Sequence, residues 1–365
     1  MSDKPASRRR ATLDDVAREA GVGIATVDRV LNERGNVSAK TAERILTTAR
    51  MLGLRRTLPD LHRRALRIEV ILPRPELSLI ARMNESFARL ARRVDRSVVI
   101  HRAIPRSDDP KALAARIRDS RSEAIVVYAP DHPEIRAAVA QATARGTAIV
   151  TVISDLPGTP RLAYAGTDHY AAGRTAGFLL TRMLPAGGTV LVLRAHFGIQ
   201  SHAERIRGFS EEIAAHGGAR IAEILEGGDD AETSELLLRR AIPRHAPVHA
   251  LYNVGAGNRA IGAVIGSNLF RAPPLFIGHE LTPYTIPMLR DGRMTFALDQ
   301  NPDLQAAFAI DVILSHFGHA EPGELHPPYE SHVPVTLYTP RNLPVGKPEH
   351  RVVTARSRRA VGDDP

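Results

Sequence analysis

The stretch from Ala11 to Leu54 restricts the fold more than any other part of this 365-residue chain. Thr12 followed by Asp15 is the pattern of a helix N-cap with a capping box, and apolar residues then recur at helical spacing. The break at Gly21–Gly23 is too short to reverse the chain fully, and a second short helix is expected over about Ile24–Leu31. The two helices should therefore cross each other at a tight, glycine-containing turn.

A third helix is expected to begin after Ser38, a good N-cap residue, and to end at Gly53. Three short helices with a tight turn between the first two predict a helix-turn-helix unit, whose second helix can enter a DNA major groove. Arg29 on that helix can donate two hydrogen bonds to guanine or bind a phosphate. Asp28 would repel phosphate, so it is expected to accept from cytosine or to orient Arg29. An ordinary three-helix bundle is the alternative.

This stretch resembles the DNA-binding headpiece of the LacI/GalR (lactose repressor) family. The residues that carry the resemblance are Thr12-Leu13-x-Asp15-Val16-Ala17, Ala20-Gly21-Val22, Thr26-Val27-x-Arg29-Val30-Leu31-Asn32 and Val37-Ser38-x-Lys40-Thr41. Gly23 and Asp28 stand where the family usually has serine, which favours a different operator sequence. The headpiece residues predicted to contact DNA are Thr12, Ile24, Ala25, Thr26, Asp28, Arg29, Asn32, Asn36, Ser38, Lys40 and Thr41.

Residues 55–65 join the headpiece to the rest of the chain. In the LacI/GalR family this segment commonly forms a hinge helix that folds on the operator and wedges an apolar side chain into the minor groove. The resemblance makes Leu58 and Leu61 the available wedges, with Arg55 and Arg56 available for phosphates. The family's usual hinge motif is missing here, so a basic tether is the alternative.

Positive charge is concentrated at the two ends of the chain. The net charge is +9, and residues 1–67 hold fifteen Lys and Arg against eight Asp and Glu. Residues 341–365 are also basic, which leaves the middle of the chain nearly neutral. A basic head on a neutral body indicates a polyanion-binding module attached to another domain. The arm over residues 1–10 is expected to contact phosphates or to be a solvated disordered arm, and the 341–365 tail is expected to be mostly disordered.

From Leu66 onward, short apolar runs alternate with amphipathic stretches, which is the pattern of parallel sheets covered by helices. The rhythm stops near Ala165 and starts again, so we expect a two-lobed, doubly wound α/β body after the all-α headpiece. Strands are expected at 66–72, 97–104, 124–128, 148–153, near 162, 189–193, 220–225, 248–254, 274–278 and 294–299. Helices are expected at 79–94, 110–120, 133–145, 171–183, 203–216, 232–241, 258–269 and 302–316.

The body resembles the periplasmic-binding-protein-like effector domain of the same family, closer to its ribose-binding branch. The resemblance is carried by AGTDHYAAGRTAG (165–177), ERIRGF (204–209), GHE (278–280) and ALDQNP (297–302). It implies three crossings of the chain between the lobes, near Ala165, Gln300 and His316. The effector domain is expected over 66–340, with lobe 1 at about 66–165 and 301–316 and lobe 2 at about 166–300 and 317–340.

A ligand of such a body should lie between the lobes, since ligands of open α/β sheets bind beyond the carboxyl ends of the strands. Amides, carboxylates and nearby rings suit a polyhydroxylated ligand, whose hydroxyls both donate and accept hydrogen bonds. The resemblance implies ligand contacts by Glu280 and Gln300. It places the family's ligand-binding arginine at Ala203, so His202 or His196 is expected to replace it. The predicted ligand-binding residues are Glu76, His132, Asp155, His196, His202, Asn253, Asn258, His279, Glu280 and Gln300.

Several other classes of protein are disfavoured. The chain has no cysteine, no apolar run of membrane length and no apolar core of a secretory signal near its start, so a cytoplasmic location without a membrane partner is expected. Gly255–Ala260 resembles a dinucleotide fingerprint but comes late in the second lobe, where helix–strand packing explains it better. No catalytic residues, metal site or cofactor are expected, because no nucleophile–base pair occurs and His196 with His202 lacks a third ligand.

The sequence therefore predicts a homodimeric transcription regulator, most simply a repressor, that binds double-stranded operator DNA. A dimer is expected because one headpiece reads only a half-site. Its operator affinity should be controlled by a sugar, polyol or related metabolite in the cleft. The alternatives are a sugar-binding receptor or sugar-processing enzyme with an appended nucleic-acid-binding head, and a non-specific DNA binder.

Overall fold

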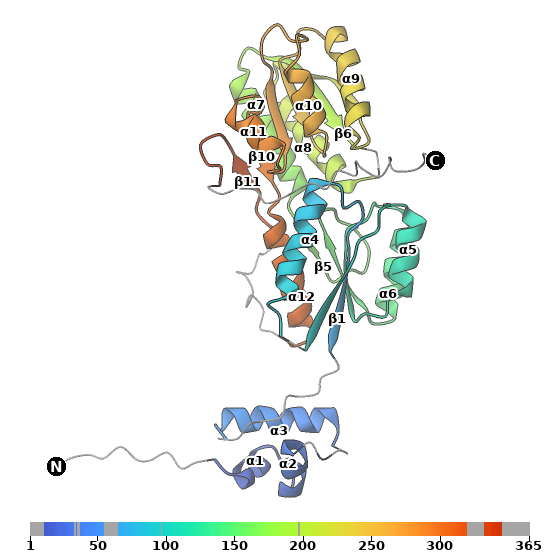
Figure 1. The fold of residues 1–365 in the computed structure, drawn as a ribbon, viewed down its shortest axis with the longest axis vertical. Coiled ribbons are helices and arrows are strands. Elements are labelled where there is room, and N and C mark those ends of the chain that lie inside the picture. The colour runs from blue at the N-terminus through green and yellow to red at the C-terminus, as the bar shows by residue number, and fades with distance from the viewer. Residues whose placement is uncertain are drawn as a thin grey trace, which may run out of the picture. The chain divides into compact units, whose positions relative to one another are not determined.

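The computed structural model describes residues 11–32, 34, 37–54, 65–95, 97–195, 198–319 and 332–344. The chain divides near Leu66 into two compact units, a small helical one and a large α/β one. The predicted class of fold is present in both (Figure 1).

The small unit consists of α1 (Leu13–Glu19), α2 (Ile24–Leu31) and α3 (Ala39–Met51). The predicted capping box is formed, because the Asp15 backbone N–H donates to the Thr12 hydroxyl at 3.3 Å and the Thr12 N–H donates to the Asp15 carboxylate at 2.9 Å. The three helices bury a shared apolar core, which is Val16, Ala17, Ala20, Val27, Val30, Leu31, Ile45, Leu46 and Ala49. This burial fixes which face of α2 points outward.

Lobe 1 of the large unit is built on a sheet of order β2-β1-β3-β4-β5, in which β1 with β3, β3 with β4 and β4 with β5 pair in parallel. Its strands are β1 (Leu66–Ile71), β2 (Val98–Ala103), β3 (Ala124–Val127), β4 (Ala148–Val152) and β5 (Ala163–Ala165). Every residue of β3 and β4 is buried, as expected for a parallel sheet covered on both faces.

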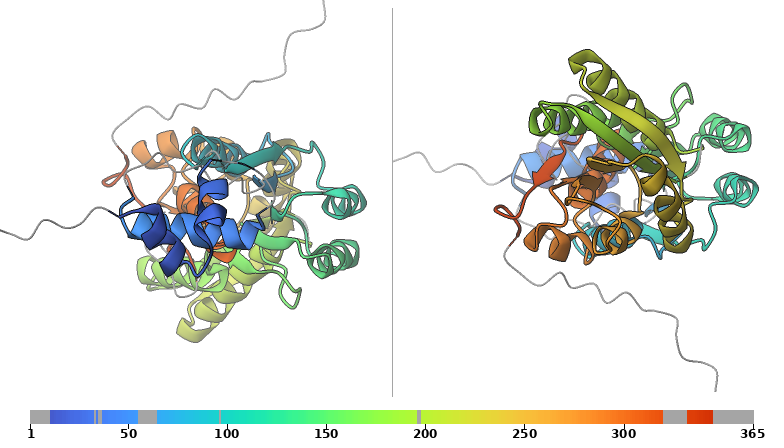
Figure 2. Two further views of the ribbon diagram at one scale, coloured as in Figure 1. Left: turned by 90° about the horizontal axis from the view of Figure 1, so that it is seen from below. Right: turned by 90° about the horizontal axis from the view of Figure 1, so that it is seen from above.

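Two pairs of helices cover this sheet. On one face α5 (Pro110–Asp119) and α6 (Pro133–Ala144) lie side by side, as Figures 1 and 2 show. On the other face α4 (Ser78–Ala91) packs against α12 (Pro302–His316), which also contacts β4 and β5. Helix α12, which lies late in the sequence, thus completes lobe 1.

Lobe 2 is built on a sheet of order β11-β10-β9-β8-β6-β7, parallel except for β11. Its strands are β6 (Gly188–Arg194), β7 (Ala219–Glu226), β8 (Ala250–Asn253), β9 (Leu275–His279), β10 (Phe296–Asp299) and β11 (Thr336–Tyr338). Its helices are α7 (His169–Met183), α8 (Gln200–His216), α9 (Ala231–Arg244), α10 (Asn258–Ile265) and α11 (Thr285–Arg290).

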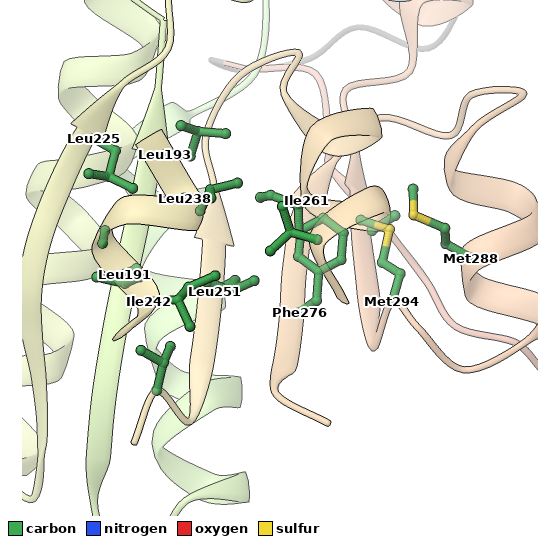
Figure 3. Close-up of a cluster of buried hydrophobic side chains, with 14 of the residues drawn as sticks. Leu191, Leu193, Leu225, Leu238, Ile242, Leu251, Ile261, Phe276, Met288 and Met294 are labelled. Carbon is green, nitrogen blue, oxygen red and sulfur yellow. The ribbon is translucent and has the colours of Figure 1, made fainter. Parts of the chain in front are cut away.

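The alternation of side chains along β6 divides the lobe 2 core into two layers. Leu191 and Leu193 face α9, α10 and α11 in the cluster that Figure 3 shows. Val190 and Val192 face the opposite way, toward α7 and α8. Successive residues of a strand point to opposite faces, so one strand of uninterrupted apolar residues supports both layers.

The elements differ from the sequence expectation mainly in lobe 2. Helix α10 ends at Ile265 rather than Leu269, because Gly266 caps it. Helix α11 was not expected, because its sequence contains Pro287. It can form because Pro287 lies in the first turn, where a helix tolerates proline. Strand β11 was not expected either, because its three residues are half-buried at the sheet edge and show no apolar pattern.

Helices α7 and α8 pack closely enough that only glycine fits at two positions. A Cβ atom at Gly173 would overlap the backbone carbonyl of Arg205, and one at Gly208 would overlap that of Tyr170. The contact fixes the height of α8, and therefore of Arg205, relative to α7.

Replacing Gly208 by Ala is expected to destabilise the large unit by about 1–3 kcal/mol, because the added methyl group meets backbone that cannot move aside. The urea midpoint of unfolding measures this. Gly266→Ala is the matched control, since its Cβ would have only ordinary contacts and no positive φ. Equal midpoints for the two variants would contradict the close packing of α7 and α8.

Candidate functional site

The outward face of α2 is available to a partner. Ile24, Ala25 and Arg29 are exposed, whereas Thr26 and Asp28 are half-buried. Asp28 accepts a hydrogen bond from Asn32 Nδ2 at 2.6 Å and lies 3.9 Å from the Arg34 guanidinium. The carboxylate is therefore held by Asn32 and Arg34 rather than by Arg29.

The other predicted DNA contacts have varied surroundings. The Thr12 hydroxyl is engaged in the α1 cap, and the hydroxyls of Ser38 and Thr41 lie 2.8 Å apart at the start of α3. The positions that lie outside the described residues are Asn36, Arg55, Arg56, Leu58 and Leu61, together with the side chain of Lys40.

The two lobes enclose a cavity of about 350 Å³ at the carboxyl ends of their strands. From lobe 1 it is lined by Arg74, Glu76, Leu77, Ser78, Leu79, Ile80, Tyr128 and Ile153. From lobe 2 and the chain crossing it is lined by Ser201, His202, Arg205, Asp229, Asp230, Ala231, Gly255, Ala256, Asn258, Arg259, His279, Glu280, Thr282, Tyr284 and Gln300.

The backbone is strained around this cavity. Arg74, Ile153, Asp229 and Glu280 all line it and all have positive φ, at 59°, 66°, 56° and 74°. Each follows a strand closely, where the chain must turn sharply away from the cleft. Non-glycine residues adopt this conformation at a cost, and such costs gather at functional sites.

The floor of the cavity is a buried polar network. Gln300 donates from Nε2 to the Glu280 carboxylate at 2.5 Å, and the other oxygen of that carboxylate lies 3.3 Å from the Arg82 guanidinium. Burial, followed by the negative charge of Asp299, raises the pKa of Glu280 to about 7. The oxygen Oε1 of Gln300 is buried and has no hydrogen-bond partner within the described part of the chain.

Arg205 of α8 is buried at the cavity wall, with 2 % of its surface exposed. It donates from Nε to His169 at 3.2 Å and from one terminal nitrogen to the Val254 carbonyl at 2.6 Å. Within the ranges that the structure describes, no carboxylate comes within ion-pair distance of it, and burial lowers the pKa of its guanidinium. A buried guanidinium with neutral partners retains capacity to donate to a ligand.

Two buried histidines stand beside Arg205. Burial, followed by the positive charge of Arg205, lowers the pKa of His169 and of His279 well below the usual range. His279 lies at 3.0 Å from the Tyr252 hydroxyl through Nε2, which holds its ring in place. Both rings are therefore neutral hydrogen-bonding groups near neutral pH.

Six of the ten predicted ligand residues line the cavity, namely Glu76, His202, Asn258, His279, Glu280 and Gln300. Asn253 lies one layer behind, where it donates to the Asn258 side chain at 2.6 Å. His196 lies outside the described residues.

His132 and Asp155 do not line the cavity, because other groups engage them. The His132 ring caps α6 by accepting from the Glu134 N–H at 3.2 Å. Asp155 is paired with Arg161 through two contacts of 2.5 Å and accepts from the Thr151 hydroxyl. A position after a strand is thus not sufficient for a place in the cleft.

Arg205 lines the cavity although it was not among the predicted ligand residues, whereas Ala203 does not line it. Helix α8 presents Ser201, His202 and Arg205 to the cavity, which is one face of its first turns. The ERIRGF run contains Arg205, but the resemblance placed the family's ligand-binding arginine two residues earlier, at Ala203. Asp229 and Arg259 also line the cavity but were not predicted as ligand contacts, because strand-end loops vary in which side chain they turn inward.

Two further features concern metal ions and membranes. Across the described ranges, no group of three or more His, Asp or Glu is arranged to hold a metal ion. None of the helices found there is both long enough and apolar enough to cross a membrane.

A helix-turn-helix unit followed by two lobes around a polar cleft defines the class of ligand-responsive DNA-binding regulators. Comparison with protein families agrees. The model described as "Bacterial regulatory proteins, lacI family" matches residues 12–56, and the model of a periplasmic binding protein domain matches residues 70–321. The chain belongs to the periplasmic binding protein domain family, and its headpiece is that of the lacI family of bacterial regulatory proteins.

Similar proteins are sugar-binding proteins by their names. The xylose/arabinose-binding protein of Sulfolobus acidocaldarius is 26% identical over 152 residues, 40% of this chain and 37% of that protein. The D-ribose/D-allose-binding protein of Pseudomonas aeruginosa is 26% identical over 153 residues, 41% of this chain and 47% of that protein. The matched region thus spans less than half of either relative.

Solved structures share the fold of the large unit. A solute-binding protein from Burkholderia graminis in complex with D-arabinose has a TM-score of 0.69 at 20% identity, covering 76% of this chain and 96% of that one. A glucose-galactose binding protein from Geobacillus stearothermophilus has a TM-score of 0.67 at 21% identity, covering 77% and 99%.

The ionisable groups of the cleft predict the pH dependence of stability. His169 and His279 bind protons below about pH 6.5 in the unfolded chain but not in the folded one, so stability falls on acidification. Glu280 acts in the opposite direction. In the folded state the Glu280 carboxyl takes up a proton as the pH falls through about 7. Its contribution to stability is therefore complete below its ordinary pKa of 4.5 and is lost as the pH rises through 7.

Replacing Glu280 by Gln removes the contribution of Glu280 to the pH dependence of stability and leaves that of the two histidines. The melting temperature of the variant should therefore fall more steeply between pH 7 and pH 5 than that of the wild type, as measured by calorimetry in matched buffers. Parallel profiles would show that the Glu280 carboxyl does not carry the raised pKa.

Proposed function

We propose that this chain is a cytoplasmic, homodimeric transcription repressor whose cleft binds a sugar or a related polyhydroxylated metabolite. The observation that carries the proposal is the buried Oε1 of Gln300 at the cavity wall, which has no partner within the described ranges, with the Arg205 guanidinium lining the same cavity. A buried acceptor without a partner costs about 1–3 kcal/mol, so a ligand that supplies a donor there is favoured.

The arrangement of donors and acceptors suits hydroxyl groups. Glu280 and Gln300 offer oxygen acceptors, and Arg205 offers donors, within one cavity. A sugar hydroxyl donates once and accepts twice, so it can satisfy both kinds of group together. The names of the relatives, which bind xylose, arabinose, ribose and allose, support the same ligand class.

The DNA partner is argued from the headpiece. Its α2 exposes Ile24, Ala25 and Arg29 on the side away from the apolar core, where they can reach base edges. One such helix reads a half-site, so a homodimer on a two-fold symmetric operator is expected. The basic residues of the arm and linker would add salt-dependent affinity for phosphates.

Control of DNA binding would follow from the two-lobed cleft. A ligand that touches both lobes binds best to the arrangement in which both walls reach it, and so shifts the population of lobe arrangements. The effect on DNA is then the difference in operator affinity between these arrangements.

Replacing Arg29 by Ala is expected to weaken binding to an operator selected from a random duplex library by about 1–3 kcal/mol, through loss of a bidentate base contact. Fluorescence anisotropy at fixed salt measures it. Arg18→Ala on α1, which is also an exposed arginine, is the control that should leave specificity intact. A variant without Arg29 that still prefers the operator over random DNA as strongly as the wild type would refute the assignment of α2.

A panel of ribose, allose, xylose, arabinose, glucose and galactose should contain a sugar that stabilises the protein thermally. At a hundred times its dissociation constant the gain is about 2.7 kcal/mol. Gln300→Leu and Arg205→Met should each abolish the shift with that sugar, while His132→Asn, which lies outside the cavity wall, should retain it. If the first two variants respond like the wild type, the cavity is not the sugar site.

A further inference from the structure

Arg82 of α4 joins the two lobes behind the cleft. It belongs to lobe 1, yet its guanidinium makes two contacts with the Asp299 carboxylate of β10, at 2.6 and 3.2 Å, and one with Glu280 at 3.3 Å. The Asp299 side chain is 2 % exposed, that of Glu280 10 % and that of Arg82 19 %. A single cation of lobe 1 thus forms ion pairs with two buried anions of lobe 2.

The contacts fix the Glu280 carboxylate from both sides. One oxygen accepts from Arg82 and the other from Gln300 Nε2. Glu280 itself lines the cavity, whereas Arg82 does not. Any influence of Arg82 on a ligand must therefore act through Glu280.

Arg82 also lowers the pKa of Glu280. The charged groups that face Glu280 are Asp299 from β10, Arg82 from α4 and Arg205 from α8. Burial and Asp299 raise the pKa of Glu280, and the two arginines lower it. Asp299 accepts hydrogen bonds from the backbone N–H groups of Leu281 and Asn301, both at 2.8 Å. Loss of Arg82 should therefore raise the pKa of Glu280.

We propose that Arg82 is a positioning residue of the cleft, which orients the Glu280 carboxyl as a hydrogen-bond acceptor and favours that role from across the boundary between the lobes. An ionised carboxylate accepts from ligand hydroxyls, while a protonated one also donates. Recognition by lobe 2 therefore depends on a side chain of lobe 1. The ligand part of this inference rests on the proposed function, and the state of Glu280 does not.

The test is a pH titration of the Glu280 carboxyl in the full chain. It is monitored by ¹³C NMR of protein labelled at the glutamate side-chain carboxyls. Glu280→Gln identifies the resonance. Arg82→Met should raise the titration midpoint by about one pH unit or more, since it removes an opposite charge within contact distance. Arg82→Lys, which retains the charge, should restore most of the wild-type midpoint.

Asp299→Asn makes the opposite prediction and covers the case in which Arg82→Met does not fold. The substitution removes the negative charge beside Glu280, and Arg82 then interacts with Glu280 as its only charged partner of the pair. The titration midpoint of Glu280 should therefore fall below that of the wild type. Arg89→Met is the matched control, because Arg89 lies on the same helix and pairs with Asp303 away from the cavity. A midpoint that Arg82→Met leaves unchanged, or that Asp299→Asn raises, overturns the proposal.

Sugar binding gives a second readout. With D-ribose and D-xylose as probes, the pH at which Arg82→Met loses half of the wild-type affinity should coincide with its Glu280 midpoint, and Arg82→Lys should restore binding. Loss of affinity in Arg82→Met that is independent of pH would overturn the positioning role. If neither these nor the other panel sugars bind the wild type, the proposed ligand class fails, while the NMR titration still decides the role of Arg82.

Discussion

The carboxyl ends of two parallel sheets face one cleft, and every polar group buried there must find a partner. Arg82, Asp299, Glu280 and Gln300 satisfy one another behind the cavity, whereas Arg205 makes its hydrogen bonds to neutral groups. The Oε1 atom of Gln300 has no hydrogen-bond partner among the residues that the structure describes. The polar network that closes the floor of the cleft thus also determines what it can still bind.

The sheets and the headpiece could be predicted from the sequence, because their signals are local. Uninterrupted apolar runs identified β3 and β4, and the Thr12–Asp15 pair identified the start of α1. Strand β11 could not be predicted in this way, because its pairing with β10 brings together distant parts of the chain. A three-residue edge strand carries too little apolar pattern to be recognised alone.

The cleft was predictable only in part. Glu280 and Gln300 follow their strands directly and line the cavity, as expected. Asp155 occupies an equivalent place in the sequence, but Arg161 pairs with it. The contact between Arg82 and Asp299 spans 217 positions and could not be inferred, because nothing local in either segment indicates the other. Sequence position thus identifies candidates, and pairing in three dimensions selects among them.

The central claim is that one chain couples a ligand in the cleft to DNA on the headpiece. The most direct measurement is a pair of titrations with the wild-type protein: the operator dissociation constant with and without a saturating sugar, and the sugar dissociation constant with and without saturating operator. Linkage requires the two constants to change by the same factor. We expect a shared factor of about 5 to 150, and unchanged constants for a sugar that does bind would contradict the coupling of the cleft to the headpiece.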